Sequence, residues 1–336
     1  MVFCLKVKEK LGILYTICRT QHRIRMSVIV TEGLSKTYHS GFFGRQEIHA
    51  LAPTSLSIEK GEIFGLLGPN GAGKTTFIKL LLAIIFPSSG SAELLGHPIS
   101  DYSIKEKIGY LPENHRYPSY LTGEQVLSFF GKLSGLNAAD IPPRIDELLS
   151  IVDMTQWRRT KIKKYSKGML QRIGLAQAML NNPDVIFLDE PTDGVDPIGR
   201  KEIRDVLRRI RDDGKTVFLN SHLLSEVELI SDRVGILNKG VLIKTGSIDA
   251  LTRAPEEYIF RTTEPMSADI QSELSSRSFV VTERDHEYFI RAENSMHLNT
   301  VIDILRKHNV QIESIVPHRT TLEESFISLI QTETSR

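Results

Sequence analysis

The sequence predicts an α/β fold in which buried parallel strands alternate with helices, with an inserted helical lobe and a small α+β domain after it. Three observations predict it. Residues 62–67 indicate a buried apolar strand that enters a glycine-rich loop, and residues 77–82 indicate the helix that leaves it. Residues 185–188 are apolar and lead directly into two carboxylates, which is typical of a buried parallel strand. After residue 246 the elements follow the order βαββαβ.

Length, composition and charge set limits on the function. The chain has 336 residues, enough for two cores, and is 40% hydrophobic and 25% charged, as ordinary globular proteins are. Its net charge of +1 shows no basic excess, so no nucleic-acid partner is expected. The apolar run at 80–86 is far shorter than the roughly 20 residues that cross a bilayer. Both cysteines, Cys4 and Cys18, lie near the N-terminus, which predicts a folded body without disulfides, as in a reducing compartment.

Residues 1–26 are predicted to be an N-terminal extension or a misplaced start of the chain. Residues 11–18 are weakly apolar and have basic flanks, as a signal sequence has, but no small-residue cleavage site follows them. Met26 stands directly before a strand-like segment at 28–30. The folded body is therefore predicted to begin at residue 27.

The glycine-rich loop matches the pattern G-x-x-x-x-G-K-[ST] in a strand, loop and helix context. Its glycines carry no Cβ, so successive backbone N–H groups can surround a phosphate at the positive end of the following helix. Lys74 is expected to reach the β- and γ-phosphates of a nucleotide, and the Thr75 hydroxyl to hold Mg²⁺. The alternative is a glycine-rich turn with a surface lysine. The predicted nucleotide-binding residues of the loop are Gly68, Pro69, Asn70, Gly71, Ala72, Gly73, Lys74, Thr75 and Thr76.

The segment before this loop predicts two strands, 28–30 and 56–58, joined by a polar loop that contains Tyr38. An aromatic side chain at this distance from the glycine-rich loop could stack on adenine. Tyr38 is the candidate, Phe42 or Phe43 could serve instead, and a packed loop tyrosine is the alternative.

Between about residue 113 and residue 180 the pattern becomes helical and predicts a lobe inserted into the α/β core. A capping box of Thr122 and Gln125 opens its first helix, and Ser166 is placed as the N-cap of its last. The other elements predicted up to residue 246 are strands at 91–95, 108–112, 185–189 and 216–220, helices at 121–133, 145–154 and 197–211, and a hairpin at 234–244.

The segment 247–336 predicts a separate domain. Its order, βαββαβ with a final helix, is the ferredoxin-like layout. The strands are predicted at 257–262, 279–281, 288–291 and 312–316, and the helices at 268–276, 297–307 and 322–330.

The glycine-rich loop, the segment 165–169 and the pair Asp189-Glu190 occur in one order, and this order resembles the ATP-binding subunit of an ABC transporter. The resemblance covers residues 27–246 and implies a P-loop NTPase fold, the ABC cassette, that binds ATP and Mg²⁺ and hydrolyses ATP. The likeness is to the subfamily that powers exporters whose membrane permease is a separate polypeptide. The tail at 322–326 is similar to the tails of that group.

The resemblance implies roles for three residues beyond the loop. Asp189 resembles the Walker B aspartate, which holds Mg²⁺. Glu190 is similar to the catalytic glutamate that polarises the attacking water, and repulsion from a nearby γ-phosphate would suit this base function. His222 resembles the switch histidine that touches the γ-phosphate. A surface ion pair for the carboxylates and a packed histidine are the alternatives.

The segment 165–169 resembles the signature Leu-Ser-Gly-Gly-Gln but departs from it at Tyr165, Lys167 and Met169. The implied mechanism rests on Ser166 and Gly168 at the start of a helix, which the family aims at the γ-phosphate held by the opposite subunit. Lys167 adds a positive charge there.

Two further segments depart from the family's pattern. Glu113 stands where the family usually has glutamine, but a carboxylate can still ligate Mg²⁺, so Glu113 is included among the predicted metal ligands. The segment 193–196 resembles the loop that crosses between subunits, where the family often begins with serine rather than Asp193.

The helical lobe is where the family docks a coupling helix of the permease. The apolar residues for such a groove, with helix packing as the alternative, are Tyr117, Tyr120, Leu121, Phe129 and Phe130.

The resemblance implies a head-to-tail homodimer with two ATP molecules at its interface, whose closing and opening a membrane permease uses. It also implies a cytoplasmic protein, peripheral on the inner face of the cell membrane through its permease.

Two other classes of function stay open. One is a soluble ATPase of the same superfamily acting on nucleic acid or ribosomes, although such proteins usually carry tandem cassettes or a coiled-coil insert. The other is a non-hydrolysing ATP-binding regulator.

Overall fold

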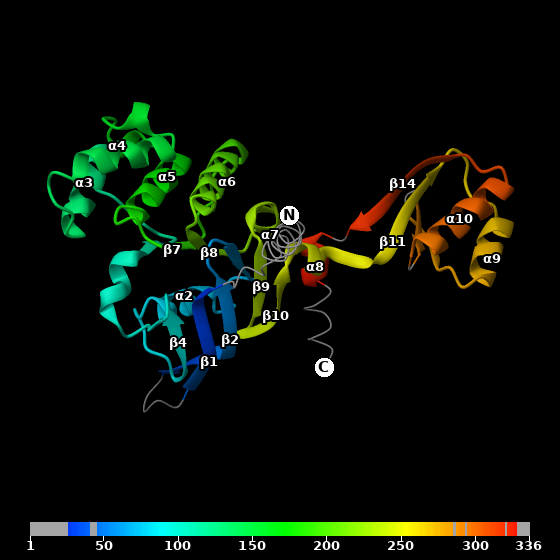
Figure 1. Ribbon diagram of the computed structural model, residues 1–336, viewed down its shortest axis with the longest axis horizontal. Coiled ribbons are helices and arrows are strands. Elements are labelled where there is room, and N and C mark those ends of the chain that lie inside the picture. The colour runs from blue at the N-terminus through cyan, green and yellow to red at the C-terminus, as the bar shows by residue number, and fades with distance from the viewer. Residues whose placement is uncertain (1–25, 41–45, 285–286, 293, 320, 328–336) are drawn as a thin grey trace, which may run out of the picture.

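The computed structural model describes residues 26–40, 46–284, 287–292, 294–319 and 321–327. The predicted N-terminal extension lies outside the described residues except for Met26, and so do Phe42 and Phe43. Figure 1 shows the sheets of the cassette with a helical lobe beside them, and a small domain at the end of a long two-stranded ribbon.

A six-stranded sheet forms the centre of the cassette, with the strand order β10-β9-β3-β8-β7-β6. The strands from β9 to β6 are parallel, and β10 forms the predicted hairpin with β9. Every residue of β3, β7 and β8 is buried, which explains their continuous apolar runs. Because carboxyl ends of parallel strands meet at one edge, the loops after β3, β6, β7 and β8 lie together. The strands are β3 (Ile63–Leu67), β6 (Ile108–Leu111), β7 (Val185–Asp189), β8 (Thr216–Ser221), β9 (Arg233–Asn238) and β10 (Val241–Ser247).

An antiparallel sheet with the order β2-β1-β4-β5 lies against the central one. A shared core joins the two sheets and helix α2, and its aromatic centre is Phe64, Phe77, Phe187 and Phe218. This packing fixes α2 directly behind the glycine-rich loop. The elements are β1 (Ser27–Ser40), β2 (Gln46–Glu59), α2 (Lys74–Leu81), β4 (Ser89–Leu94) and β5 (His97–Pro98).

The predicted polar loop around Tyr38 is wrong, because β1 continues through this residue to Ser40. Tyr38 pairs with Ile48 and Thr37 with His49 across the ladder to β2. Pairing with β2 satisfies the backbone N–H and C=O groups, so the polar side chains of this exposed ribbon do not end the strand. Polar composition alone does not indicate that β2 pairs with this segment.

The helical lobe contains α3 (Gly123–Leu133), α4 (Ile141–Ile151) and α5 (Lys167–Ala178), with short 3-10 turns η3 (Thr155–Trp157) and η4 (Ile162–Lys164). The capping box at the start of α3 is present as predicted, with Thr122 and Gln125 bonding each other's backbone N–H groups. Ser166 caps α5 by accepting a hydrogen bond from the Met169 N–H at 3.2 Å. The other elements around the central sheet are η2 (Tyr102–Lys107), α6 (Pro197–Asp212), α7 (Leu224–Ile230) and α8 (Ile248–Thr252).

The C-terminal domain is one antiparallel sheet, β12-β13-β11-β14, with a core of its own around Phe260, Tyr288 and Leu305. This strand order is that of the predicted ferredoxin-like layout. The strand expected at 279–281 begins two residues later than predicted. The elements are β11 (Arg253–Thr262), α9 (Ala268–Ser276), β12 (Val281–Arg284), β13 (Glu287–Arg291), α10 (Ser295–Lys307) and β14 (Ile312–Arg319).

The chain returns from this domain to the cassette. Strands β11 and β14 pair along the ribbon seen in Figure 1, and residues 322–327, which follow, are helical. Leu322 is fully buried in the cassette's main core, its N–H donates to Glu228 Oε2 of α7 at 3.1 Å, and the Ser325 hydroxyl donates to the Leu251 carbonyl oxygen at 2.8 Å. The division between 27–246 and 247–336 stays a prediction, but α8 and Leu322 pack with the cassette.

Candidate nucleotide-binding site

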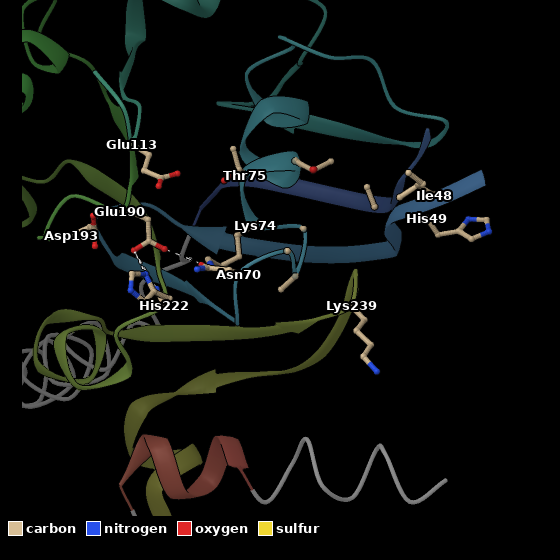
Figure 2. Close-up of a pocket in the computed structure, with 15 residues that line it drawn as sticks. Ile48, His49, Asn70, Lys74, Thr75, Glu113, Glu190, Asp193, His222 and Lys239 are labelled. Carbon is tan, nitrogen blue, oxygen red and sulfur yellow. Dashed lines mark hydrogen bonds and ion pairs between the residues drawn. The ribbon is translucent and has the colours of Figure 1, made fainter. Parts of the chain in front are cut away.

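An open pocket of about 770 Å³ lies at the carboxyl edge of the central sheet. Figure 2 shows Lys74, Glu190 and His222 converging on one side of it and Glu113 facing them. The pocket has contributions from the glycine-rich loop and from the loops after β6, β7 and β8, which is the edge that the parallel topology predicts. The residues that line it are Ile48, His49, Ala50, Asn70, Gly71, Ala72, Gly73, Lys74, Thr75, Thr76, Glu113, Glu190, Asp193, His222 and Lys239.

The glycines of the loop are required by its backbone and its neighbours. Gly71 and Gly73 have φ of 80° and 103°, a left-handed conformation that favours glycine. A Cβ at Gly68 would collide with the Leu237 carbonyl oxygen, and one at Gly73 with the Ala50 carbonyl oxygen. Gly73 is also the N-cap of α2 and offers no side-chain acceptor to the helix. The positive end of α2 is therefore left to interact with an anion in the pocket.

Lys74 is a buried cation at the centre of the site. Its Nζ donates to the Gly68 carbonyl oxygen at 2.7 Å and lies 3.7 Å from Glu190 Oε1. Burial lowers the pKa of Lys74, while the charges of Glu190 and Asp189 oppose that shift. A phosphate placed in this pocket would add a further counter-charge, so the site favours a polyanionic ligand.

The Asp189 carboxylate is held at the end of β7 by two polar neighbours. Thr75 Oγ1 donates to its Oδ1 at 3.5 Å, and Asn220 Nδ2 donates to the same oxygen at 3.2 Å. Asn220 was not singled out from the sequence, although its signal was available. It is the second-last residue of the neighbouring parallel strand β8 and pairs in register with Asp189.

Glu190 and His222 form a linked pair in front of Lys74. Glu190 Oε2 accepts the backbone N–H of His222 at 3.3 Å and lies 2.8 Å from its Nδ1. Glu190 also has a φ of 53°, in the left-handed region that non-glycine residues seldom occupy. Such strained backbone concentrates at functional sites, where the surrounding structure holds it in place.

Tyr38 is placed outside the lining of the pocket. It lies on β1 directly opposite Ile48, which does line the pocket, so the two side chains share a face of the ribbon. The Lys36 ammonium stands 5.1 Å from the centre of the Tyr38 ring. Contact between Tyr38 and adenine stays a prediction.

Four lining residues were missed from the sequence, namely Ile48, His49, Ala50 and Lys239. Lys239 is at the tip of the hairpin between β9 and β10, where the Gly240 N–H donates to the Ala72 carbonyl oxygen at 2.9 Å. No local pattern indicates that this hairpin touches the glycine-rich loop, because the two segments are far apart in the sequence.

Two residues of the signature segment, Ser166 and Gly168, do not belong to the lining of the pocket of their own chain. Ser166 is exposed at the start of α5. Lys167 Nζ forms an ion pair with Asp193 Oδ2 at 3.0 Å, which lowers the pKa of the Asp193 carboxyl. Two departures from the family's pattern are therefore in contact with each other.

The apolar residues of the predicted docking groove divide into two groups. Tyr117, Leu121 and Phe130 pack against the core, whereas Tyr120 and Phe129 are 69% and 56% exposed. A second hollow of about 600 Å³ lies beside α3 and α4. Its lining includes Phe129, Lys132, Ile141, Ile145 and Arg159.

The fold and the site define a P-loop ATPase. The family description "ABC transporter" matches residues 51–193. An uncharacterized ABC transporter ATP-binding protein of Nostoc sp. is 47% identical over 234 residues, covering 69% of this chain and 70% of the relative. The daunorubicin resistance ATP-binding protein of Streptomyces coeruleorubidus is 31% identical over 309 residues, covering 90% of this chain and 96% of that protein.

Among solved structures, cbiO1 from Clostridium perfringens, part of the ABC transporter complex cbiONQ, has a TM-score of 0.60 and 28% identity. The match covers 67% of this chain and 90% of that one. This chain belongs to the ABC transporter family as an ATP-binding subunit, and it is an ATPase. No helix in the described part of the chain is long and apolar enough to cross a membrane.

Proposed function

We propose that this chain is the ATP-hydrolysing subunit of an exporter, that it works as a homodimer around two ATP molecules, and that it drives a separately encoded membrane permease. The observation that carries the proposal is the division of the site. Lys74, Glu190 and His222 converge on one pocket, as Figure 2 shows, while Ser166 is exposed and does not line that pocket.

The residues around Lys74 fit hydrolysis of a γ-phosphate. Lys74 and the loop N–H groups would hold the β- and γ-phosphates. Glu190 would take the proton of the attacking water, since its carboxylate faces the pocket and His222 orients its Oε2. His222 would then be in reach of the γ-phosphate from the other side of Glu190. This arrangement argues against a non-hydrolysing regulator.

Mg²⁺ fits the oxygen donors of this site. The Thr75 hydroxyl and the carboxylates of Asp189 and Glu113 are hard ligands of the kind that Mg²⁺ prefers, and nucleotide phosphates and water would complete its shell. The described residues contain no cluster of three or more His, Cys, Asp or Glu that would hold a metal ion without a nucleotide. The ion would neutralise charge on the transferred phosphoryl group.

The homodimer follows from the position of the signature segment. Ser166 and Gly168 stand at the N-terminus of α5, where backbone N–H groups and the helix dipole attract anions. They do not line their own chain's pocket, so they would meet a phosphate only in the pocket of a second copy. Each ATP would then be completed by the partner, and hydrolysis would let the two copies separate.

The proposals of a permease partner and of export rest on the names of the relatives and on the exposed residues of the helical lobe. One relative is a daunorubicin resistance ATP-binding protein, a name that favours export. Exposed Phe129, which lines the hollow at α3 and α4, and exposed Tyr120 would receive a segment of the permease. The chain would therefore act on the cytoplasmic face of the membrane, held there by its permease.

Sedimentation of a Glu190→Gln variant tests the dimer, because slow hydrolysis preserves the ATP-bound state. With ATP and Mg²⁺ this variant is expected to be dimeric, and without nucleotide monomeric. Adding Ser166→Glu, which places a carboxylate against the partner's phosphate, is expected to restore the monomer. A Glu190→Gln variant that stays monomeric in saturating ATP would contradict the sandwich.

Purification from membranes tests the partner. Co-purification with one membrane protein that raises ATP turnover would support the transport role. Turnover that rises with DNA, RNA or ribosomes, and not with membranes, would replace the proposal with a soluble ATPase of the same superfamily.

A further inference from the structure

The segment that follows β6 connects the pocket to the signature helix. Glu113 lines the nucleotide pocket. Two residues after Glu113, the chain lies against α5. His115 and Tyr117 both contact that helix through side-chain atoms. The position of Glu113 is therefore tied to the helix that begins at Ser166.

His115 makes the central contact. Its Nε2 lies 3.2 Å from the carbonyl oxygen of Leu170 on α5, and its Nδ1 lies 3.2 Å from the carbonyl oxygen of Pro112. Both carbonyl oxygens can only accept, and a neutral imidazole carries one N–H, so the neutral ring donates to one of them at a time and only the protonated ring donates to both. One ring thus spans the residue directly before Glu113 and the first turn of the signature helix.

A glycine in α5 makes room for this ring. A Cβ at Gly174 would lie 3.1 Å from His115 Nε2 and 2.5 Å from Leu111 Cδ1. Because distances this short force a neighbour to move, any other residue at 174 would displace the imidazole or the Leu111 side chain. The absence of a side chain at Gly174 therefore allows α5 to pack closely against the segment after β6.

Tyr117 holds the far end of the same segment. Its hydroxyl donates to Gln177 Oε1 of α5 at 2.7 Å, and its ring packs 5.4 Å from the His115 ring and 5.9 Å from the Phe130 ring. Burial raises the pKa of Tyr117, so the hydroxyl keeps its proton and continues to donate. The segment is therefore fastened at two points on one helix.

We propose that His115 is a positioning residue for ATP hydrolysis, which fixes the Glu113 carboxylate in the pocket by tying the residues around it to α5. The inference rests on the proposed role of Glu113 at the γ-phosphate and its Mg²⁺. Without the contact between His115 and Leu170, Glu113 would occupy more than one position, and the productive one would be less populated. The nucleotide itself is held by the glycine-rich loop, so its affinity would change little.

Three substitutions at this position separate the two contacts. His115→Gln places an amide N–H near the site of Nε2 and keeps the contact with Leu170, whereas His115→Asn places one near Nδ1 and loses it. His115→Phe keeps the ring against Tyr117 and loses both hydrogen bonds. A lost hydrogen bond of ordinary strength corresponds to about tenfold in rate. We expect kcat to fall about tenfold in His115→Asn and in His115→Phe and to stay within about threefold in His115→Gln. The KM for ATP is expected to stay within about threefold in all three variants.

A double-mutant cycle with Glu113→Ala is the decisive measurement. If His115 acts through Glu113, then His115→Asn and His115→Phe lower kcat by less than about twofold in the Glu113→Ala background. Independent losses that multiply in the double variants would overturn the inference. Tyr117→Phe, which removes the second fastening point but leaves His115 in contact with Leu170, is expected to lower kcat less than His115→Phe does.

The cycle separates this inference from the proposed site. A Glu113→Ala variant with unchanged kcat would remove the role of Glu113 and the inference together. A Glu113→Ala variant with lowered kcat and multiplicative effects would remove the inference alone. Thermal unfolding of each variant shows whether it is folded, and the cycle rests on His115→Phe alone if His115→Asn unfolds below the assay temperature.

Discussion

Neutralising Glu190 is expected to lower ATP hydrolysis while leaving ATP binding in place. The Glu190 side chain is buried, with Oε2 bonded by His222 and Oε1 3.7 Å from Lys74 Nζ. Glutamine has nearly the same size, and its amide oxygen can still accept the His222 N–H. The substitution therefore removes the negative charge and the basicity while leaving the shape of the pocket.

The size of the effect follows from the assigned role. A positioned general base contributes about 10²–10⁴-fold, which raises the barrier by roughly 3–5 kcal/mol at 1.36 kcal/mol for each factor of ten. ATP binding should be equal or tighter, because a carboxylate that repels the γ-phosphate is gone. Lys74 loses its nearest counter-charge, but the phosphates replace it when ATP is bound.

Steady-state phosphate release and displacement of a fluorescent nucleotide measure the two quantities in the same samples. Glu62→Gln is the matched control, because Glu62 is 7% exposed, similar to the 6% of Glu190, yet bonds Arg233 outside the pocket. The control is expected to keep its turnover. A Glu190→Gln variant with more than about a tenth of wild-type turnover would refute the general-base role. Loss of ATP binding would instead make Glu190 a structural partner of Lys74.

Three other predictions concern stability and the charge around the site. Leu322→Ala should lower the free energy of unfolding by about 2–5 kcal/mol in urea titrations, since Leu322 is fully buried; a loss below about 1 kcal/mol would mean that the tail does not dock. Gly65→Ala should cost about 1–3 kcal/mol in the same assay, because the new Cβ would collide with Val227, and an unchanged midpoint would contradict this contact. Lys167→Ala should change stability by less than about 1 kcal/mol but lower ATP turnover, because the Asp193 carboxylate would then face the phosphates unpaired. Asp193→Asn in the same chain should restore that turnover, and a double variant no faster than Lys167→Ala would contradict the reasoning.

The elements that were predicted well from the sequence are those whose formation depends on residues close together in the chain. The strand at 185–189 needed only its apolar run, because a strand buried on both faces leaves that pattern wherever it occurs. The N-cap at Ser166 and the capping box at Thr122 are also decided within four residues. The convergence of Lys74 and Glu190 followed from parallel topology, since they stand beyond the carboxyl ends of β3 and β7, two strands of the same parallel sheet.

The features that the sequence did not show depend on contacts between distant segments. Strand β1 extends through Tyr38 because β2 pairs with it, and no property of residues 36–40 reveals that partner. Lys239 and His49 reach the pocket because backbone hydrogen bonds bring the hairpin of Gly240 against Ala72 and Ala52. Such contacts depend on how separate elements pack against each other, and local composition predicts them only weakly.

The charges of the pocket give one reason why ATP should arrive with a cation. Three carboxylates line it, which alone would repel a polyphosphate. Lys74 lies 3.7 Å from Glu190, and Lys167 lies 3.0 Å from Asp193, so two of the three have a counter-charge. Glu113, the third, makes no ion pair with any described residue within 4.0 Å. A divalent cation between this carboxylate and the phosphates would complete the balance, which is the chemistry that Mg²⁺ supplies in ATP hydrolysis.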